Sequence, residues 1–407
     1  MKKIFIIGNN QSSLALAKKM SVAADVFVTS NLNFIDFAVC VDIREDNIKE
    51  LLDFVLENEI DLTIVVSDIA IRENIAEAFN FAKQSIFAPI SKSAEIVYNK
   101  ALAKKNMYKL RIPTPKFGIF DKENAALDYL KTQKMPCVLK TNDSNSAVVV
   151  TSYDLAKSLV NRMFIEKNTK IIVEDYVYGT PFSFYTITDG YKALPIGSSI
   201  NYKYFLDGDG GQLTNGMGSV VPNYKLSIDQ EYYLMDEVIY PEIEYLQMCN
   251  TPYVGVLGIN GIITEEGNIS ILGWHSFMQN SDIAGILEQI DEDLYGLFMS
   301  CAMGIFSDET ETIRLKNGSS ATVVLMCREN SNNENVISGV ENVSENAIVS
   351  YYPNVTKNRY IEYQVQSSGP VISVTMSAST AGNAVKYVYD EIKEIDFTGK
   401  YYRKDIK

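Results

Sequence analysis

Residues 2–8, KKIFIIG, are a short β-branched run that ends in glycine, and they set the interpretation of the first ninety residues. Residues 12–20 follow with apolar side chains at helical spacing, so that strand, tight turn and helix open a βαβ unit. We expect further strands at 24–29, 37–41, 62–66 and 85–87, and helices at 47–58 and 72–83. This alternation predicts a small doubly wound parallel sheet.

The pattern changes after residue 90. Residues 91–112 are predicted to be helical, and the helix must stop at IPTP because Pro113 and Pro115 force extended backbone. Beyond it we expect an α+β body with mostly antiparallel pairing, long helices at 229–249 and 286–303, and a hairpin turning at 266–268. From about residue 318 the chain is β-rich, and a helix at 381–395 closes it. The predicted fold class is therefore α/β plus α+β.

Charge and length narrow the class of function. The 407 residues suggest two to four domains at about 150 residues each. Lys and Arg number 37 against 51 Asp and Glu, which gives a formal net charge of −14. A chain this acidic is a poor match for nucleic acid or an anionic membrane, so we expect neither as a partner. A local basic pocket for a phosphorylated small molecule is compatible with it.

Rare residues exclude several chemistries. His275 is the only histidine, which excludes sites that need two, such as HExxH zinc sites. The five cysteines are scattered without a CxxC pair, which predicts reduced thiols in a cytoplasmic protein. The apolar run before Gly8 has only four residues, too few for a signal peptide, and no apolar run approaches the roughly 18 residues of a membrane span.

The segment 207–218, DGDGGQLTNGMG, is the first candidate for chemistry. Its glycines let backbone N–H groups approach a ligand and form a concavity that binds anions. The alternative is a flexible hairpin loop without a ligand. The ending TNGMG at 214–218 favours the functional interpretation, because it is unusual for a plain loop.

Two lysines and an acidic strand end form the second candidate. Lys100 precedes the IPTP break and Lys140 ends the apolar strand CVLK, so the pair can clamp nucleotide phosphates as point charges. The alternative for both is a solvated surface lysine. The acidic pair Glu174–Asp175 follows another apolar strand and can hold a nucleobase amino group or a ribose, although a strand ending in solvent gives the same pattern.

The segment 273–276, GWHS, holds the only Trp and the only His of the chain. Asp282 lies shortly after it, so that His275 and Asp282 are the candidate metal ligands. The alternative for a lone histidine is a hydrogen-bonded structural role. At the other end of the chain, residues 8–13 can present backbone amides to a phosphate at a helix N-terminus.

Taken in order, these pieces resemble the phosphoribosylamine–glycine ligase family of the ATP-grasp superfamily along nearly the whole chain. The resembling stretches are IFIIGNNQSSLALAKKM at 4–20, DLTIVVSD at 61–68, IFAPISKSAEIVYNKALAKKNMYKLRIPTP at 86–115, DGDGGQLTNGMGSVVP at 207–222 and KYYRKDI at 400–406. The segment at 86–115 and the loop at 207–222 are the most specific.

The resemblance implies four parts and a reaction. The parts are a Rossmann-like domain at 1–98, two ATP-grasp subdomains at 99–190 and 191–317, and a β-rich C-terminal domain at 318–407. ATP phosphorylates the carboxylate of glycine, and the amine of phosphoribosylamine displaces phosphate from the acyl phosphate. The implied cofactors are ATP and Mg²⁺, which bridges the phosphates. We expect a cytoplasmic monomer whose partners are these small molecules.

Carried over residue by residue, the resemblance assigns roles to the candidates. Lys100 and Lys140 correspond to the nucleotide-phosphate lysines, and Glu174, Asp175 and Val177 to the adenine-binding hinge. The substrate loop keeps the family's residues, of which Asp209, Thr214 and Gly216 are the catalytic candidates and Asp207, Met217 and Gly218 the substrate-binding ones.

The chain departs from the family at several motifs. The family's GGREH is NNQSS at 9–13, and the Gly-rich lid with its lysine is TNDSNSA at 141–147. The family's ribose-binding Glu falls on Thr180-Pro181, and the metal-binding Glu-Phe-Asn is replaced by Gly273-Trp274-His275. Glycine brings no side-chain oxygen to Mg²⁺, and imidazole is a softer ligand that suits other metals.

Two hypotheses follow. The first is an ATP-dependent carboxylate–amine ligase of the phosphoribosylamine–glycine ligase type, which serves purine biosynthesis. The alternative is a catalytically degenerate ATP-grasp paralogue that binds or regulates, or a ligase with a changed substrate.

Overall fold

The structure is a computed structural model that describes residues 2–32, 34–143, 147–167, 170–306, 310, 312–328, 335–358 and 362–407. None of the helices in this part of the chain combines the length and the apolarity that a bilayer span requires.

The N-terminal part is a five-stranded parallel sheet in the order β3–β2–β1–β4–β5, as the alternation predicted. Its strands are β1 (Lys2–Ile7), β2 (Ala24–Thr29), β3 (Val39–Val41), β4 (Leu62–Val65) and β5 (Ile86–Phe87). Its helices are α1 (Gln11–Met20), α2 (Ile48–Asn58), α3 (Asp68–Arg72) and α4 (Ile75–Phe81). Alternate side chains of β1 enter different cores, Ile4 and Ile6 on one face and Phe5 and Ile7 on the other. The carboxyl ends of the parallel strands share one edge, where such sheets bind ligands.

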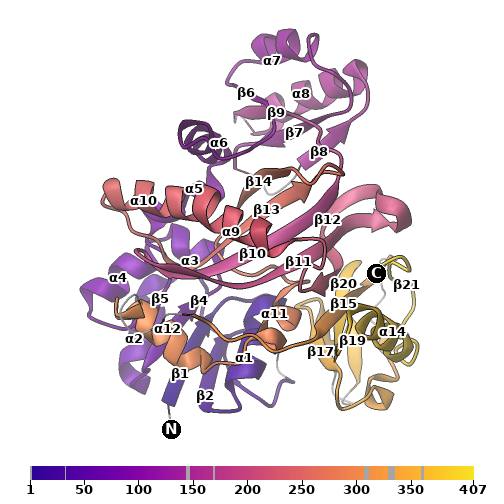
Figure 1. Cartoon of the computed structure of the whole chain (residues 1–407). Coiled ribbons are helices and arrows are strands. Elements are labelled where there is room, and N and C mark those ends of the chain that lie inside the picture. The colour runs from indigo at the N-terminus through magenta and orange to yellow at the C-terminus, as the bar shows by residue number, and fades with distance from the viewer. Residues whose placement is uncertain are drawn as a thin grey trace.

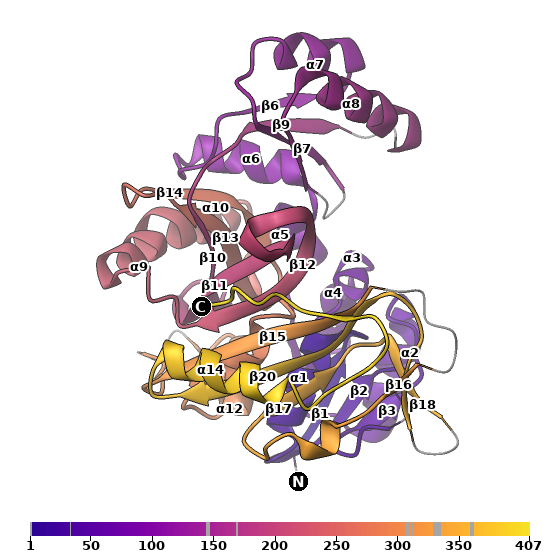
Figure 2. The ribbon, with the colours of Figure 1, turned by 90° about the vertical axis from the view of Figure 1, so that its right-hand side faces the viewer.

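Two helices lead from this sheet to a smaller unit. They are α5 (Ser91–Tyr98) and α6 (Lys100–Lys109). The smaller unit is an antiparallel sheet of four strands in the order β6–β9–β7–β8, namely Phe117–Phe120, Ile171–Asp175, Cys137–Thr141 and Ala147–Val150. Its core is completed by α7 (Glu123–Leu130) and α8 (Tyr153–Lys167). Both ribbon views show this unit projecting from the top of the molecule, above the large sheet (Figures 1 and 2).

A nine-stranded sheet forms the rest of the body. Its order is β14–β13–β10–β11–β12–β15–β20–β17, with β21 beside β15. The strands are β10 (Thr180–Asp189), β11 (Ala193–Leu206), β12 (Gly210–Val221), β13 (Val254–Ile263), β14 (Ile269–His275), β15 (Ser319–Cys327), β17 (Ile348–Tyr351), β20 (Gly369–Ala378) and β21 (Lys400–Tyr401). One sheet therefore joins the middle of the chain to its C-terminal part, and β10 belongs to it rather than to the smaller sheet.

The remaining elements cover this sheet. Three short strands pair in the order β16–β19–β18, at Val336–Ile337, Tyr363–Val365 and Val355–Lys357. The helices are α9 (Ile228–Leu234), a π-turn at Met235–Ile239, α10 (Tyr240–Met248), α11 (Ile283–Gln289), α12 (Leu294–Ala302) and α14 (Ala381–Glu391). The fold class α/β plus α+β is confirmed: a parallel N-terminal sheet is followed by antiparallel sheets.

Several predicted helices are interrupted in the structure, each for a local reason. The segment 91–112 breaks at Asn99, whose side chain caps α6 by accepting from the Leu102 N–H at 3.0 Å. The segment 286–303 is two helices, and Asp293 caps the second. The helix at 229–249 widens into the π-turn just before Pro241, which has no N–H to continue the regular ladder.

Candidate active site

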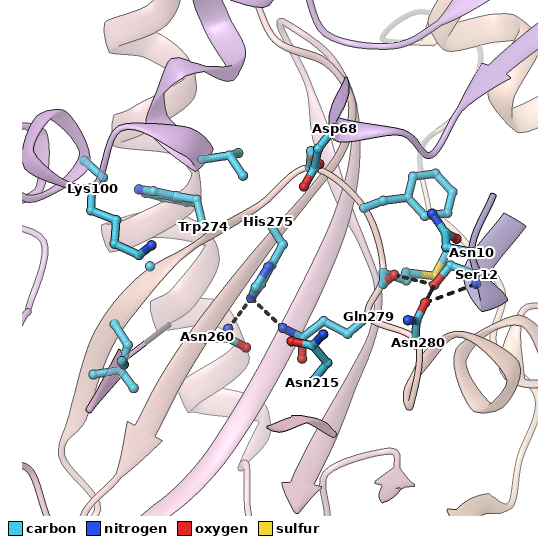
Figure 3. A pocket seen from close by; sticks show the side chains of 18 of the residues that line it. Asn10, Ser12, Asp68, Lys100, Asn215, Asn260, Trp274, His275, Gln279 and Asn280 are labelled. Carbon is cyan, nitrogen blue, oxygen red and sulfur yellow. Dashed lines mark hydrogen bonds between the residues drawn. The ribbon is translucent and has the colours of Figure 1, made fainter. Parts of the chain in front are cut away.

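A cavity of about 890 Å³ lies where the carboxyl edge of the N-terminal sheet, helix α6, the smaller sheet and the large sheet meet. Its walls carry residues from the first βα turn, from α6, from β7 and β9, and from β11 to β14. Figure 3 shows Lys100 and Asp68 facing it from the N-terminal half, Asn260 and His275 from the large sheet, and Gln279 from the segment after β14. Segments far apart in the sequence thus meet in one place.

Four lysines line one end of the cavity: Lys100, Lys104, Lys140 and Lys203. They come from α6, from β7 and from β11, so that no single element positions them. Burial lowers the pKa of Lys203 to about 8, and burial together with Lys140 lowers that of Lys100 to about 8. This end of the cavity attracts anions.

Glu174 is the carboxylate that holds two of these lysines. Its oxygens lie 2.7 Å from the Lys140 ammonium and 3.2 Å from that of Lys104, and it is buried. Burial raises the pKa of Glu174, but the two lysines outweigh that effect and leave this pKa below its usual value. The Lys104 ammonium also donates to the Thr114 hydroxyl at 2.6 Å, which ties α6 to the segment after it.

The predicted adenine hinge divides between the cavity and its surroundings. Glu174 lines the cavity, but its side chain is engaged by the lysines. Asp175 is the last residue of β9 and Val177 follows the strand, and neither is among the lining residues. Asp175 continues the sheet by donating its N–H to the Lys116 carbonyl at 2.9 Å.

The segment 207–218 is a hairpin rather than an open loop. A short turn at Asp207–Asp209 joins β11 to β12, and the ladder shifts register between Tyr204 and Tyr202. At this irregularity Thr214 and Asn215 reach the cavity, and Thr214 donates to the Lys203 carbonyl at 2.9 Å. The structure therefore brings one predicted catalytic residue, Thr214, to the site.

The other predicted residues of this segment lie away from the cavity lining. Met217 is fully buried in the sheet. A side chain at Gly216 would meet the Ser281 hydroxyl at 2.5 Å, and one at Gly218 would meet the Thr322 carbonyl at 2.4 Å. These glycines permit close packing, Gly216 against the turn before α11 and Gly218 against β15.

Asp207 and Asp209 bind the C-terminal tail. The carboxylate of Asp209 lies 2.8 Å from the buried Arg403 guanidinium, which also pairs with Asp405 at 2.6 Å. Asp207 accepts from the Lys404 N–H at 2.9 Å. The hairpin turn and the tail KYYRKDI, which stand far apart in the sequence, are therefore one structural unit.

His275 accepts hydrogen bonds at Nε2 from two amides, those of Asn260 and, at 2.8 Å, Gln279 (Figure 3). Burial and the neighbouring Lys203 and Lys100 lower the pKa of His275 to about 3, so the ring is neutral. The lone pair of Nε2 is therefore used by the hydrogen bonds from Asn260 and Gln279. Trp274, next to it, packs into the core of the large sheet.

Asp282 does not meet His275 in a shared site. It is fully buried and accepts from Tyr185, Ser199, Asn201 and Ser281 at 2.7 to 2.9 Å. Within the described residues no three His, Cys, Asp or Glu side chains gather closely enough to hold a metal ion. The donor set at this position therefore does not fit Mg²⁺.

The N-terminal half of the cavity is held by the chain's own polar groups. Glu45 accepts from the Asn9 N–H and from the Ser67 hydroxyl. Ser12 donates to the Asn280 side chain at 2.7 Å. Asp68 accepts a hydrogen bond from the Ser276 hydroxyl at 2.8 Å. The charged side chains in the cavity lining at this end are therefore the carboxylates Glu45 and Asp68.

Sequence reasoning missed Lys104, Lys203 and Glu45. Lys104 stands four residues after Lys100 and so shares its helix face, a signal that was available. Lys203 interrupts the aromatic strand NYKYF, which is a weaker signal. Of the predicted lid at 141–147, residues 144–146 lie outside the described residues.

Family models match most of this chain. The phosphoribosylglycinamide synthetase N domain matches residues 2–96, and the ATP-grasp (A) domain of the same synthetase matches residues 98–278. The chain belongs to the phosphoribosylglycinamide synthetase family. The resemblance seen in the sequence is thereby confirmed.

Relatives and solved structures agree with this family. The chain is 28% identical to a phosphoribosylamine–glycine ligase of Caldanaerobacter subterraneus and 26% identical to one of Clostridium acetobutylicum, each covering 99% of both chains. A phosphoribosylamine–glycine ligase of Thermotoga maritima has the same fold, with a TM-score of 0.82 at 18% identity over 100% of both chains. A biotin carboxylase domain solved with MgADP, from Hydrogenobacter thermophilus, has a TM-score of 0.71 at 14% identity and covers 98% of this chain and 91% of that one.

Proposed function

We propose that this chain is an ATP-dependent carboxylate–amine ligase of purine biosynthesis that joins glycine to phosphoribosylamine. The observation that carries the proposal is the convergence of Lys100, Lys140 and Lys203 from three elements on one end of a cavity whose other end is acidic. Its volume of about 890 Å³ is in the range of small-molecule sites. Full-length membership of the synthetase family supports the same chemistry.

The lysines bind the phosphates of ATP in this proposal. Lys100 and Lys140 act as point charges on the polyphosphate, and Glu174 keeps Lys140 directed into the cavity from 2.7 Å. A carboxylate oxygen of glycine forms a bond to the terminal phosphorus, and ADP leaves. The charge that develops on the transferred phosphoryl group is met by positioned ammonium groups.

The second step takes place between the hairpin and the N-terminal sheet. The amine nitrogen forms a bond to the acyl carbon. The bond between this carbon and the bridging oxygen breaks, and phosphate leaves with its electron pair. Asn215 and Lys203 face the acyl phosphate from β12 and β11. Asp68, on the acidic side, accepts hydrogen bonds from the amine and its proton as it is lost.

The test is ADP release from ATP with glycine and phosphoribosylamine, followed with and without Mg²⁺. We expect ADP formation that needs both substrates, and a loss of about a hundredfold in kcat/KM in Lys140→Met. Lys131→Met, at an exposed lysine of the same small unit, is the matched control and should leave the rate unchanged. Nucleotide binding without ADP formation would overturn the proposal in favour of a binding paralogue.

A further inference from the structure

The chain lacks metal-binding oxygens at the position where its family carries them. Gly273 stands in place of the family's Glu and lines the cavity without a side chain. A Cβ built at Gly273 meets nothing within 4 Å, so the wall is open there rather than filled by another donor. His275, two residues on, turns its accepting nitrogen to two side-chain amides.

The carboxylate at the cationic end of the cavity, Glu174, and the predicted metal ligand Asp282 are both occupied. Glu174 is held by two lysine ammonium groups. Asp282 accepts from four neighbouring side chains and does not line the cavity. Freeing either one for a divalent ion means breaking buried hydrogen bonds or ion pairs, which leaves buried polar groups without partners.

Positive charge is supplied by side chains instead. Four lysines line this end of the cavity, where Glu174 is the carboxylate paired with two of them. Lys203 projects from the irregular part of β11, beside the wall that carries Gly273 and His275. A polyphosphate placed here is neutralised by groups that are part of the fold and that need no divalent ion to assemble them.

We propose that this cavity binds nucleoside di- and triphosphates in their metal-free form, with Lys203 and its neighbouring lysines in place of the divalent cation. The inference rests on the proposed function only in placing the nucleotide in this cavity. Because it concerns nucleotide binding, it is tested separately from catalytic turnover.

Calorimetric titration of the full chain with ADP and with ATP tests it, in EDTA and in excess Mg²⁺. We expect dissociation constants that agree within about threefold between the two conditions. Nucleotide binding that is about tenfold or more tighter with Mg²⁺ would overturn the inference while leaving the ligase proposal intact. Metal-free binding without ADP release would support the inference while the ligase proposal fails, and no binding in either condition would overturn both.

Two variants sharpen the test. Lys203→Met should weaken ADP binding in EDTA about tenfold or more, because one of the four ammonium groups is lost. Lys105→Met, at an exposed lysine of α6, is the matched control and should bind as the unmodified chain does. Equal affinity of Lys203→Met and the control would contradict the assignment.

The double variant Gly273→Glu with His275→Asn restores the family's oxygen donors, and a Cβ at Gly273 has open space around it. We expect weaker ADP binding in EDTA, since a carboxylate then faces the phosphates, and recovery on adding Mg²⁺. The thermal unfolding midpoint checks that the double variant folds. If the folded double variant binds ADP as independently of Mg²⁺ as the unmodified chain does, the metal preference is not set at this wall, and the result counts against the inference.

Discussion

Glu174 decides how the cationic end of the cavity is organised. A single buried carboxylate pairs with lysines from α6 and β7, and so links two parts of the chain through charge. Removing one member of such a group leaves a buried charge without compensation. The free-energy cost of that change exceeds the net stabilisation that the ion pair provides.

Glu174→Gln should therefore destabilise the protein by about 3 kcal/mol, because Lys140 and Lys104 lose their counter-charge. The free energy of unfolding in urea measures this change. Glu237→Gln, at an exposed glutamate, serves as the control and should stay within about 0.5 kcal/mol. Equal stability of the two variants would show that the lysines need no partner.

His275 supplies a second prediction at this scale, since it is the only histidine and gives a single imidazole signal in NMR spectra. With a pKa of about 3 the ring stays neutral, so its Hε1 chemical shift should not change between pH 8 and pH 5. In the unfolded chain the same signal should titrate near the usual pKa of 6.5. A midpoint near 6 in the folded protein would contradict the neutral, doubly hydrogen-bonded ring.

At the scale of elements, the hairpin β11–β12 and the C-terminal tail support each other. Arg403 is buried and joins Asp209, Asp405 and the Tyr204 carbonyl. The hairpin carries Lys203 and Asn215 into the cavity, so the tail supports site residues although none of its own residues is in the cavity lining.

Arg403→Met should destabilise the protein by about 2 kcal/mol and speed amide hydrogen exchange in residues 207–218. The reason is the loss of several charge-assisted hydrogen bonds that hold the turn. Lys404→Met, at the exposed neighbour, keeps these bonds and should exchange as the unmodified chain does. Unchanged exchange in Arg403→Met would mean that the hairpin holds its shape without the tail.

The packing of α10 on α6 makes a pH-dependent prediction. Burial raises the pKa of Glu242 from 4.5 to about 7, although a hydrogen bond from Asn106 at 2.8 Å opposes the shift. The unfolded chain releases this proton near pH 4.5 and the folded chain near pH 7, so the stability that this group contributes is lost between these values.

Glu242→Gln cannot ionise and should be more stable than the unmodified chain at pH 8, by about 2–3 kcal/mol. Near pH 4 the advantage should disappear. Urea unfolding at both pH values measures it, with Glu244→Gln on the exposed side of α10 as the control. A gain of equal size at both pH values would point to packing rather than to ionisation.

At the scale of the whole molecule, the N-terminal sheet and the body share one core. Phe87 of β5 stacks on Phe298 of α12 with ring centroids 4.6 Å apart. The same cluster contains residues of β1 and of β10, so one face of the N-terminal sheet packs in a core that it shares with the body, while the other face has a core of its own. We propose the four-part division at 98, 190 and 317 as a description of the order of parts along the chain. By this division β10 falls in the second part, although it pairs with β11 and β13 of the large sheet.

Phe298→Ala should cost about 4 kcal/mol and lower the unfolding midpoints of both halves together. Trp274 fluorescence follows the body, and hydrogen exchange of β1 follows the N-terminal sheet. Phe81→Ala, at a side chain 93% exposed, is the control. Separate transitions in Phe298→Ala would show that the two halves are independent.

The fold was largely predictable because its determinants are local. The hydrophobic periodicity predicted the strands of the parallel sheet and the hairpin β13–β14, and the prolines at 113 and 115 predicted the end of α6. The breaks at Asn99, Asp293 and the π-turn were missed, because capping and helix widening depend on one or two side chains within a continuous apolar pattern.

The candidate site was predictable only in part. Lys100, Lys140, Glu174 and Thr214 reach the cavity as expected, since each stands at the end or irregularity of an element. The roles of Asp207 and Asp209 depend on a tail almost two hundred residues away, and no local pattern reports that contact.

By itself the sequence determined the family, the order of elements and the absence of a metal-binding Glu at Gly273, because these depend on residue identity and near-neighbour spacing. Only the tertiary structure decided that Lys203 and Lys104 join the site, that Asp282 is a buried hydrogen-bond acceptor, and that His275 is neutral. These outcomes follow from burial and from charges brought together across the fold, and such interactions depend on distance in space rather than on distance along the chain.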